Sequence, residues 1–149
     1  MTDMHAVLLP VGADLYAVPI DRVKEVVAAP GLTRLVTAPP GVLGLFNLRG
    51  QIVPLLDTAA LLGLPGAGPA AFALVLQARD GLVGLAVTAF PQRALLGTSI
   101  GPSELPGTAG TYRVERRVAV LLDPDVLLAA DRLGPAPGGG IIVSSGVGR

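Results

Sequence analysis

The hydrophobic positions of this chain fall into short runs that are separated by glycine, proline and small clusters of polar residues. Short runs rich in valine, leucine and isoleucine are typical of β-strands, because a helix needs a longer stretch with a period of about 3.6 residues. We expect strands at 6–11, 15–18, 23–27, 32–36, 42–46, 51–56, 72–77, 82–87, 112–117 and 118–122. Many short strands punctuated in this way predict an all-β sandwich or barrel.

Helix is the minority element, and each of two predicted helices follows an aspartate that can cap it. Asp57 precedes a short helix at 58–62. Asp123, followed by Pro124, begins a second helix that continues to about residue 133. Irregular connections rich in glycine and proline are expected at 66–69, 97–110 and 134–149.

One polar tetrapeptide, Asn47-Leu48-Arg49-Gly50, lies between the apolar strands at 42–46 and 51–56. Asparagine and glycine tolerate the positive φ angles of a tight reversal, so this stretch predicts a β-hairpin with a charged tip. Taken alone, Arg49 is interpreted as a solvated turn residue, because polar turns are the rule. A binding role is the alternative, and the rest of the chain bears on it.

The chain also contains an internal repeat. Leu55-Leu56-Asp57 followed by Leu61-Leu62 recurs 66 residues later as Leu121-Leu122-Asp123 followed by Leu127-Leu128. At nearly the same offset, an acidic turn residue leads into an apolar strand at 14–18 and again at 80–86. The pattern predicts two related halves, each too small to be stable unless it packs on its twin.

Composition excludes several classes of partner. The 149 residues suit a single compact unit, and the eleven basic and eleven acidic residues cancel, so neither nucleic acid nor an anionic membrane is expected as a partner. Hydrophobic residues make up 51% of the chain, but Gly63 and Pro65 interrupt the longest relevant uncharged window, 58–78, which argues against membrane insertion. The first residues lack the features of a secretion signal, so a cytoplasmic protein is expected.

Neither a cofactor site nor a catalytic site is predicted. The chain has no cysteine, and His5 is its only histidine, so no pattern for a disulfide or a transition metal exists. Acidic residues are scattered at turns and caps, and the glycines at 138–140 lack the strand and the Lys-Ser/Thr of a phosphate loop. We therefore expect no enzymatic activity.

Several motifs occur in an order that resembles the CheW-like family of bacterial chemotaxis coupling proteins. The most specific is Gly44-Leu45-Phe46-Asn47-Leu48-Arg49-Gly50 followed by Ile52-Val53-Pro54-Leu55-Leu56-Asp57. Supporting matches are Tyr16-Ala17-Val18-Pro19-Ile20-Asp21, Val23-Lys24-Glu25-Val26, Pro39-Pro40, Leu62-Gly63-Leu64, Val83-Gly84-Leu85-Ala86-Val87 and Leu121-Leu122-Asp123. The resemblance covers about residues 5 to 133.

The resemblance implies two packed SH3-like five-stranded β-barrels with short helices. We expect one CheW-like domain over 1–133, with one barrel at about 15–80 and the other at 1–14 plus 81–133, and then a flexible Gly/Pro-rich tail at 134–149. The resemblance also implies a non-enzymatic adaptor without cofactors. Such an adaptor links the cytoplasmic tip of methyl-accepting chemoreceptors to the regulatory domain of the histidine kinase CheA.

Carried over residue by residue, the resemblance implies six partner-binding positions. They are Val23, Glu25, Gly44, Asn47, Arg49 and Gly50. The guanidinium of Arg49 can bind carboxylates or carbonyls of a helical tip while its stem covers apolar surface. Glu25 has a second interpretation, in which it pairs with Arg49, holds the hairpin in place and affects binding only indirectly.

The second half departs from the family pattern at three places. Thr88 stands where the family usually has an aspartate, Pro91 interrupts the next segment, and the hairpin at 113–118 is shorter than usual. These places lie in the half that the family uses to meet the kinase. The alternative function is a divergent CheW-like interaction module of another chemosensory or motility pathway that has lost part of the kinase-binding surface.

Overall fold

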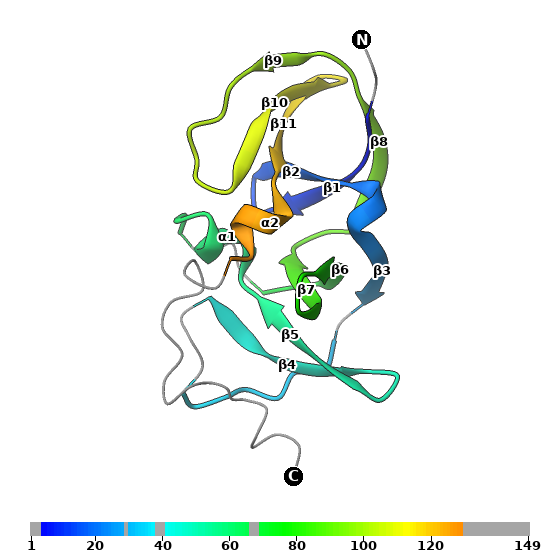
Figure 1. The fold of residues 1–149 in the computed structure, drawn as a ribbon, viewed down its shortest axis with the longest axis vertical. Coiled ribbons are helices and arrows are strands. Elements are labelled where there is room, and N and C mark those ends of the chain that lie inside the picture. Colours follow the sequence, from blue (N-terminus) through cyan, green and yellow to red (C-terminus); the bar gives the residue numbers. More distant parts are fainter. Residues whose placement is uncertain (1–3, 29, 38–40, 66–68, 130–149) are drawn as a thin grey trace.

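The computed structural model describes residues 4–28, 30–37, 41–65 and 69–129 (Figure 1). Within these ranges the chain forms eleven strands, two short α-helices and one turn of 3-10 helix. In chain order these are β1 (Met4–Val11), β2 (Asp14–Pro19), η1 (Ile20–Arg22), β3 (Val23–Ala28), β4 (Val42–Leu48), β5 (Gln51–Leu56), α1 (Thr58–Leu61), β6 (Phe72–Ala78), β7 (Gly81–Val87), β8 (Gln92–Leu96), β9 (Ser99–Gly101), β10 (Thr108–Val114), β11 (Arg117–Leu122) and α2 (Pro124–Leu127). The predicted all-β fold class is confirmed.

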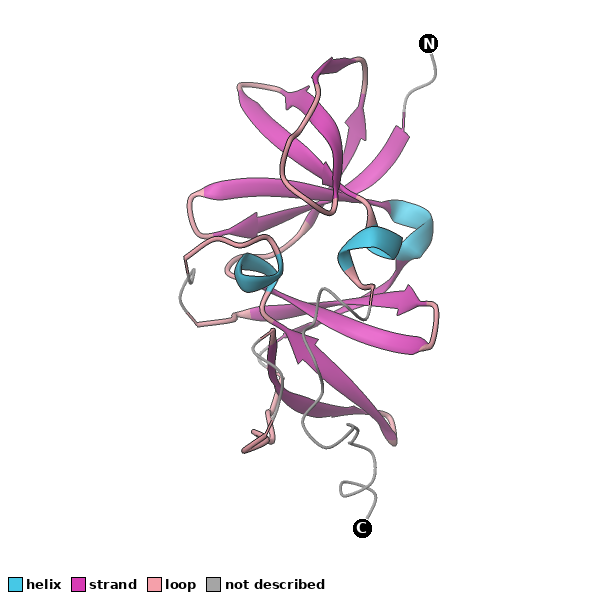
Figure 2. Ribbon diagram, turned by 60° about the vertical axis from the view of Figure 1, so that its left-hand side comes forward, coloured by secondary structure: helices cyan, strands magenta, loops and turns pink. Residues whose placement is uncertain are grey.

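The strands form two mixed sheets. One has six strands in the order β8-β1-β2-β11-β10-β9, and the other has five in the order β3-β6-β7-β5-β4. Each sheet consists of antiparallel strand pairs joined by one parallel pair, β11 with β2 in the first and β5 with β7 in the second. The two sheets stack along the long axis of the molecule, and both α-helices lie between them (Figure 2).

Hydrophobic side chains fill three layers. The middle layer lies between the sheets and combines buried residues of both sheets and both α-helices, among them Leu9, Leu56, Leu74, Leu85, Leu122 and Leu127. One further cluster belongs to the six-stranded sheet alone and another to the five-stranded sheet alone. Because side chains alternate along a strand, Leu55 packs in the cluster of the five-stranded sheet, and Leu56 packs in the middle layer between the sheets.

The internal repeat corresponds to a repeated structure. The carboxylate of Asp57 accepts from the backbone N–H of Ala60, and that of Asp123 accepts from two backbone N–H groups at the start of α2. Each aspartate also donates its own backbone N–H over 2.8 Å, to the carbonyl of Gly41 in the first half and of Gly107 in the second. The Leu-Leu-Asp motif is therefore a strand-to-helix corner used twice.

The sheets do not follow the expected barrel boundaries at 15–80 and 1–14 plus 81–133. Strand β2 pairs with β1 and β11 in the six-stranded sheet, and β7 pairs with β6 and β5 in the five-stranded sheet. Both strands remain with the hairpin partner next to them in sequence, because a tight turn fixes that pairing locally. The chain crosses between the sheets one strand later than expected, after β2 and after β7.

Several predicted elements also need correction. The strand expected at 32–36 is only a single bridge, in which Thr33 pairs with Leu45. The connection expected at 97–110 contains the edge strand β9, and β8 was not predicted. Helix α2 ends at Leu127, and the expected tail at 134–149 lies outside the described residues.

Candidate functional site

The tip of the β4–β5 hairpin is a two-residue turn. Leu48 pairs with Gln51, which leaves Arg49 and Gly50 as the loop, with φ angles of 51° and 88°. Positive φ at both positions is typical of the type I′ turn, whose twist matches that of the flanking strands. The side-chain oxygen of Asn47 accepts from the backbone N–H of Gly50 over 2.8 Å and thereby stabilises the turn.

Arg49 forms a two-pronged ion pair with Glu25 of β3. Its Nη1 donates to Oε1 of Glu25 over 3.1 Å, and its Nη2 donates to Oε2. The hydrogen bond from Arg49 lowers the pKa of Glu25, and the bond to Glu25 raises the pKa of Arg49. The Arg49 side chain is nevertheless 72% exposed, compared with 30% for Glu25, so the guanidinium is oriented by the protein and open to a partner.

This ion pair joins opposite edges of the five-stranded sheet. Strands β3 and β4 lie at its two edges, so the sheet curls until the β4–β5 tip reaches β3. Thr33 and Leu45 strengthen the closure, because each donates its backbone N–H to the carbonyl of the other, over 2.7 and 2.8 Å. The curled sheet sets the position of Arg49 relative to Glu25.

The structure separates the six predicted binding positions into two groups. Glu25, Asn47, Arg49 and Gly50 meet at the hairpin tip. Gly44 is buried, and a Cβ atom there would lie 2.8 Å from the carbonyl oxygen of Thr33. Val23 is half-buried against the shared core. Gly44 and Val23 therefore have evident packing roles, whereas the first four residues present polar groups at the surface.

Ile52 is a surface residue that the sequence reasoning missed. It pairs with Asn47 across the hairpin, so both side chains lie on the same face, and it is 47% exposed. The alternation along β5 could have indicated it, because its neighbour Val53 is completely buried. We use the name "Arg49 site" for Glu25, Asn47, Arg49, Gly50 and Ile52.

The ion pair predicts a specific acid titration. Replacing Arg49 with alanine should raise the pKa of Glu25 from its lowered value, because it removes the hydrogen bond and the positive charge that hold it down. A carboxylate with a lowered folded-state pKa stabilises the fold above its unfolded pKa, and this contribution is lost as pH falls through the lowered value. Carbon-13 NMR of the Glu25 carboxyl measures the titration, and an identical midpoint in wild type and Arg49→Ala would contradict the pairing.

The three departures from the family pattern, at Thr88, Pro91 and the 113–118 hairpin, are each accommodated within the fold. The Thr88 hydroxyl accepts from the backbone N–H of Gly12 over 3.1 Å and donates to the carbonyl of Pro10 over 3.3 Å. An ionised aspartate there could accept but not donate. Pro91 is buried, and the 113–118 hairpin is a tight two-residue turn in which Glu115 has φ of 55°.

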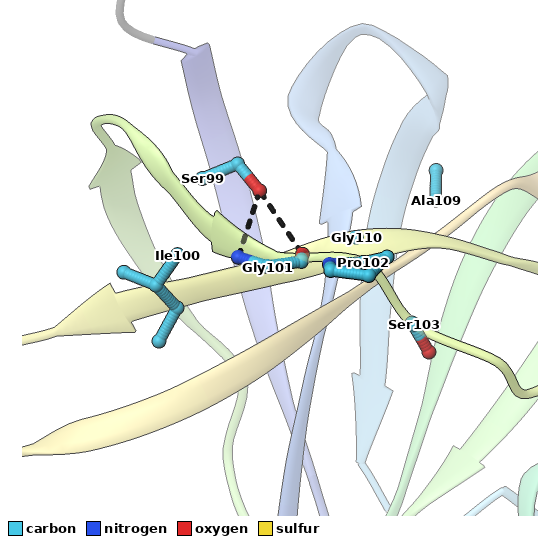
Figure 3. A pocket seen from close by; sticks show the side chains of 7 residues that line it. All are labelled: Ser99, Ile100, Gly101, Pro102, Ser103, Ala109 and Gly110. Carbon is cyan, nitrogen blue, oxygen red and sulfur yellow. Dashed lines mark hydrogen bonds between the residues drawn. The ribbon is translucent and has the colours of Figure 1, made fainter.

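A shallow groove lies beside β9 (Figure 3). Its lining, Ser99, Ile100, Gly101, Pro102, Ser103, Ala109 and Gly110, carries no titratable side chain. The Ser99 hydroxyl is hydrogen-bonded to Gly101 and donates to the carbonyl of Thr111. Across residues 4–28, 30–37, 41–65 and 69–129, no three His, Asp or Glu side chains are grouped so that they could hold a metal ion, and no helix is long and apolar enough to span a membrane.

Comparison with known proteins matches these features to one family. The family model of the CheW-like domain matches residues 5–132. The chain is 35% identical over 89 residues to a probable chemotaxis protein CheW of Rhizobium etli. The aligned segment covers 58% of this chain and 57% of that protein. It is 43% identical over 54 residues to the chemotaxis protein CheW of Helicobacter pylori, 36% of this chain and 33% of that protein.

The matched segments thus span about half or less of these curated relatives. The fold is similar to the crystal structure of the scaffolding protein TtCheW from Thermoanaerobacter tengcongensis, with a TM-score of 0.76. That similarity covers 88% of this chain and 96% of the other, at 21% identity. The resemblance inferred from the sequence motifs is confirmed, and the chain belongs to the CheW-like domain family.

Proposed function

We propose that this protein is a non-enzymatic adaptor that links the cytoplasmic tip of chemoreceptors to the regulatory domain of a CheA-type histidine kinase. Membership of the CheW-like family supports the proposal, as do relatives named chemotaxis proteins and a structural neighbour named a scaffolding protein. A cytoplasmic location follows from the proposed partners. The observation that carries the proposal is the exposed Arg49, held by Glu25 at the tip of a tight hairpin.

The Arg49 site has the chemistry of a protein contact. A guanidinium carries five N–H donors, and the pair with Glu25 uses two of them, so three are left for carboxylate or carbonyl oxygens of a partner. Ile52 adds an exposed apolar surface on the adjacent strand. Arginine beside a small apolar surface is typical of the residues that dominate binding energy at interfaces.

Exchanging the two charges separates a binding role of Arg49 from a purely structural one. Arg49→Glu alone should weaken binding to a receptor-tip fragment or to the kinase regulatory domain by about tenfold or more, since it replaces an attraction by a repulsion. The double variant Glu25→Arg, Arg49→Glu restores an ion pair at the same place. The turn accommodates glutamate, because Glu115 adopts nearly the same φ at the other hairpin tip.

We expect the double variant to melt like the wild type and still not to bind. Regained binding would instead show that only the pairing matters and that the contact lies elsewhere. Arg79→Glu is the matched control, because Arg79 is an exposed arginine at the two-residue turn of the β6–β7 hairpin in the same sheet.

The second candidate is a divergent interaction module without the kinase contact, which Thr88 and the short 113–118 hairpin favour. Calorimetric titration of the wild type with each fragment distinguishes the two candidates. Binding to both supports the adaptor, binding to the receptor fragment alone supports the divergent module, and binding to neither contradicts both.

A further inference from the structure

The β10–β11 hairpin concentrates positive charge on one end of the six-stranded sheet. Arg113, Arg116 and Arg117 are all exposed, and Glu115 is the only acidic residue among them. The ion pairs of the described residues are Arg49–Glu25 and Arg22–Asp125, so no carboxylate within the described part of the chain pairs with these three arginines. A chain with no net charge thus carries a local excess of two positive charges at this tip.

The internal repeat allows the tips of the β4–β5 and β10–β11 hairpins to be compared position by position. Glu115 occupies the position of Arg49 in the other half, with φ of 55° compared with 51°. Gln92 occupies the position of Glu25, because Leu8 pairs with Gln92 as Val75 pairs with Glu25. At the β4–β5 tip, Glu25 therefore neutralises Arg49. The β10–β11 tip has neither member of that ion pair, and it carries arginines on both sides of Glu115.

We propose that the β10–β11 hairpin is a docking surface for an acidic segment of a partner protein. Val118, which pairs with Arg113 and is 46% exposed, places an apolar contact beside Arg113. Exposed guanidiniums beside an apolar residue complement a segment of glutamates or aspartates with occasional apolar residues. This surface lies on the opposite half of the molecule from the Arg49 site (Figure 1), and its role does not depend on the function proposed for that site.

The extent of the charge favours a protein segment over other anionic partners. A nucleic-acid site commonly makes about six to ten phosphate contacts, and a polybasic membrane site has about four to eight basic residues. Three arginines are too few for either. They are enough for a short acidic peptide, whose carboxylates can each take a two-pronged guanidinium contact.

Nitrogen-15 NMR of the whole protein with a synthetic hexaglutamate peptide tests this surface. We expect chemical-shift changes at the amides of 113–118 that weaken as salt is added. Arg116→Glu combined with Arg117→Glu should weaken binding roughly five- to thirtyfold, since two exposed attractions become repulsions.

Arg34→Glu combined with Arg79→Glu is the matched control, because it reverses the same number of exposed charges elsewhere. It should bind as the wild type does, and both double variants should melt as the wild type does. Shifts centred at other residues, equal losses in both double variants, or tighter binding to duplex DNA or to phosphatidylserine vesicles than to the peptide would overturn the proposal.

Discussion

Replacing Leu56 with alanine should destabilise the protein by about 3 kcal/mol and lower its melting temperature by roughly 10 °C. Leu56 is 1% exposed and lies in the middle layer, where side chains of both sheets and both helices meet. The substitution removes buried methyl groups and leaves a cavity that two sheets cannot close without moving together. Differential scanning calorimetry should show one transition, because neither sheet retains a complete core.

The matched control is Leu95→Ala, which makes the same chemical change at a side chain that is 51% exposed. It should change the free energy of unfolding by less than about 1 kcal/mol. Two separate transitions in Leu56→Ala, or equal losses in the two variants, would contradict a shared core.

Replacing Gly44 with alanine should cost about 2 kcal/mol, although alanine suits most strands better than glycine. The added Cβ would lie 2.8 Å from the carbonyl oxygen of Thr33, which is backbone and cannot rotate away. To relieve the clash, the segment at Thr33 must move and weaken the two hydrogen bonds that it shares with Leu45. Because this bridge helps to close the curled sheet, the variant should also loosen the contact between Arg49 and Glu25.

Gly31→Ala provides the control, because its new Cβ would have no atom within 4 Å. It should be neutral or slightly stabilising. Urea denaturation of both variants measures the difference, and equal stability would show that the approach of Thr33 to Gly44 has no energetic weight.

Local signals explain which parts of the fold could be predicted. The hairpin at 42–56 and the corners at Asp57 and Asp123 depend on residues that are neighbours in sequence, and the structure confirms them. The pairing of β11 with β2, and the edge strand β8, depend on contacts between distant parts of the chain. Strand β8 has no β-branched residue and contains glutamine and arginine, so its own sequence is a weak strand signal.

The candidate site shows the same division. The charged hairpin tip was predicted from Asn47 and Gly50, but the partner of Arg49 lies 24 residues away, so pairing with Glu25 was only one of two interpretations. The structure shows that pair. The packing role of Gly44 could not be inferred, because it depends on a distant backbone segment, at Thr33, that pairs with β4.

Co-sedimentation with receptor-tip fragments on vesicles tests the adaptor function most directly. The wild-type protein should carry the kinase into the pellet, whereas Arg49→Glu should leave most of the kinase in the supernatant at the same protein concentrations. Arg79→Glu should behave as the wild type. If the kinase sediments equally with wild type and Arg49→Glu, or in the absence of this protein, the account of Arg49 as the coupling contact is wrong.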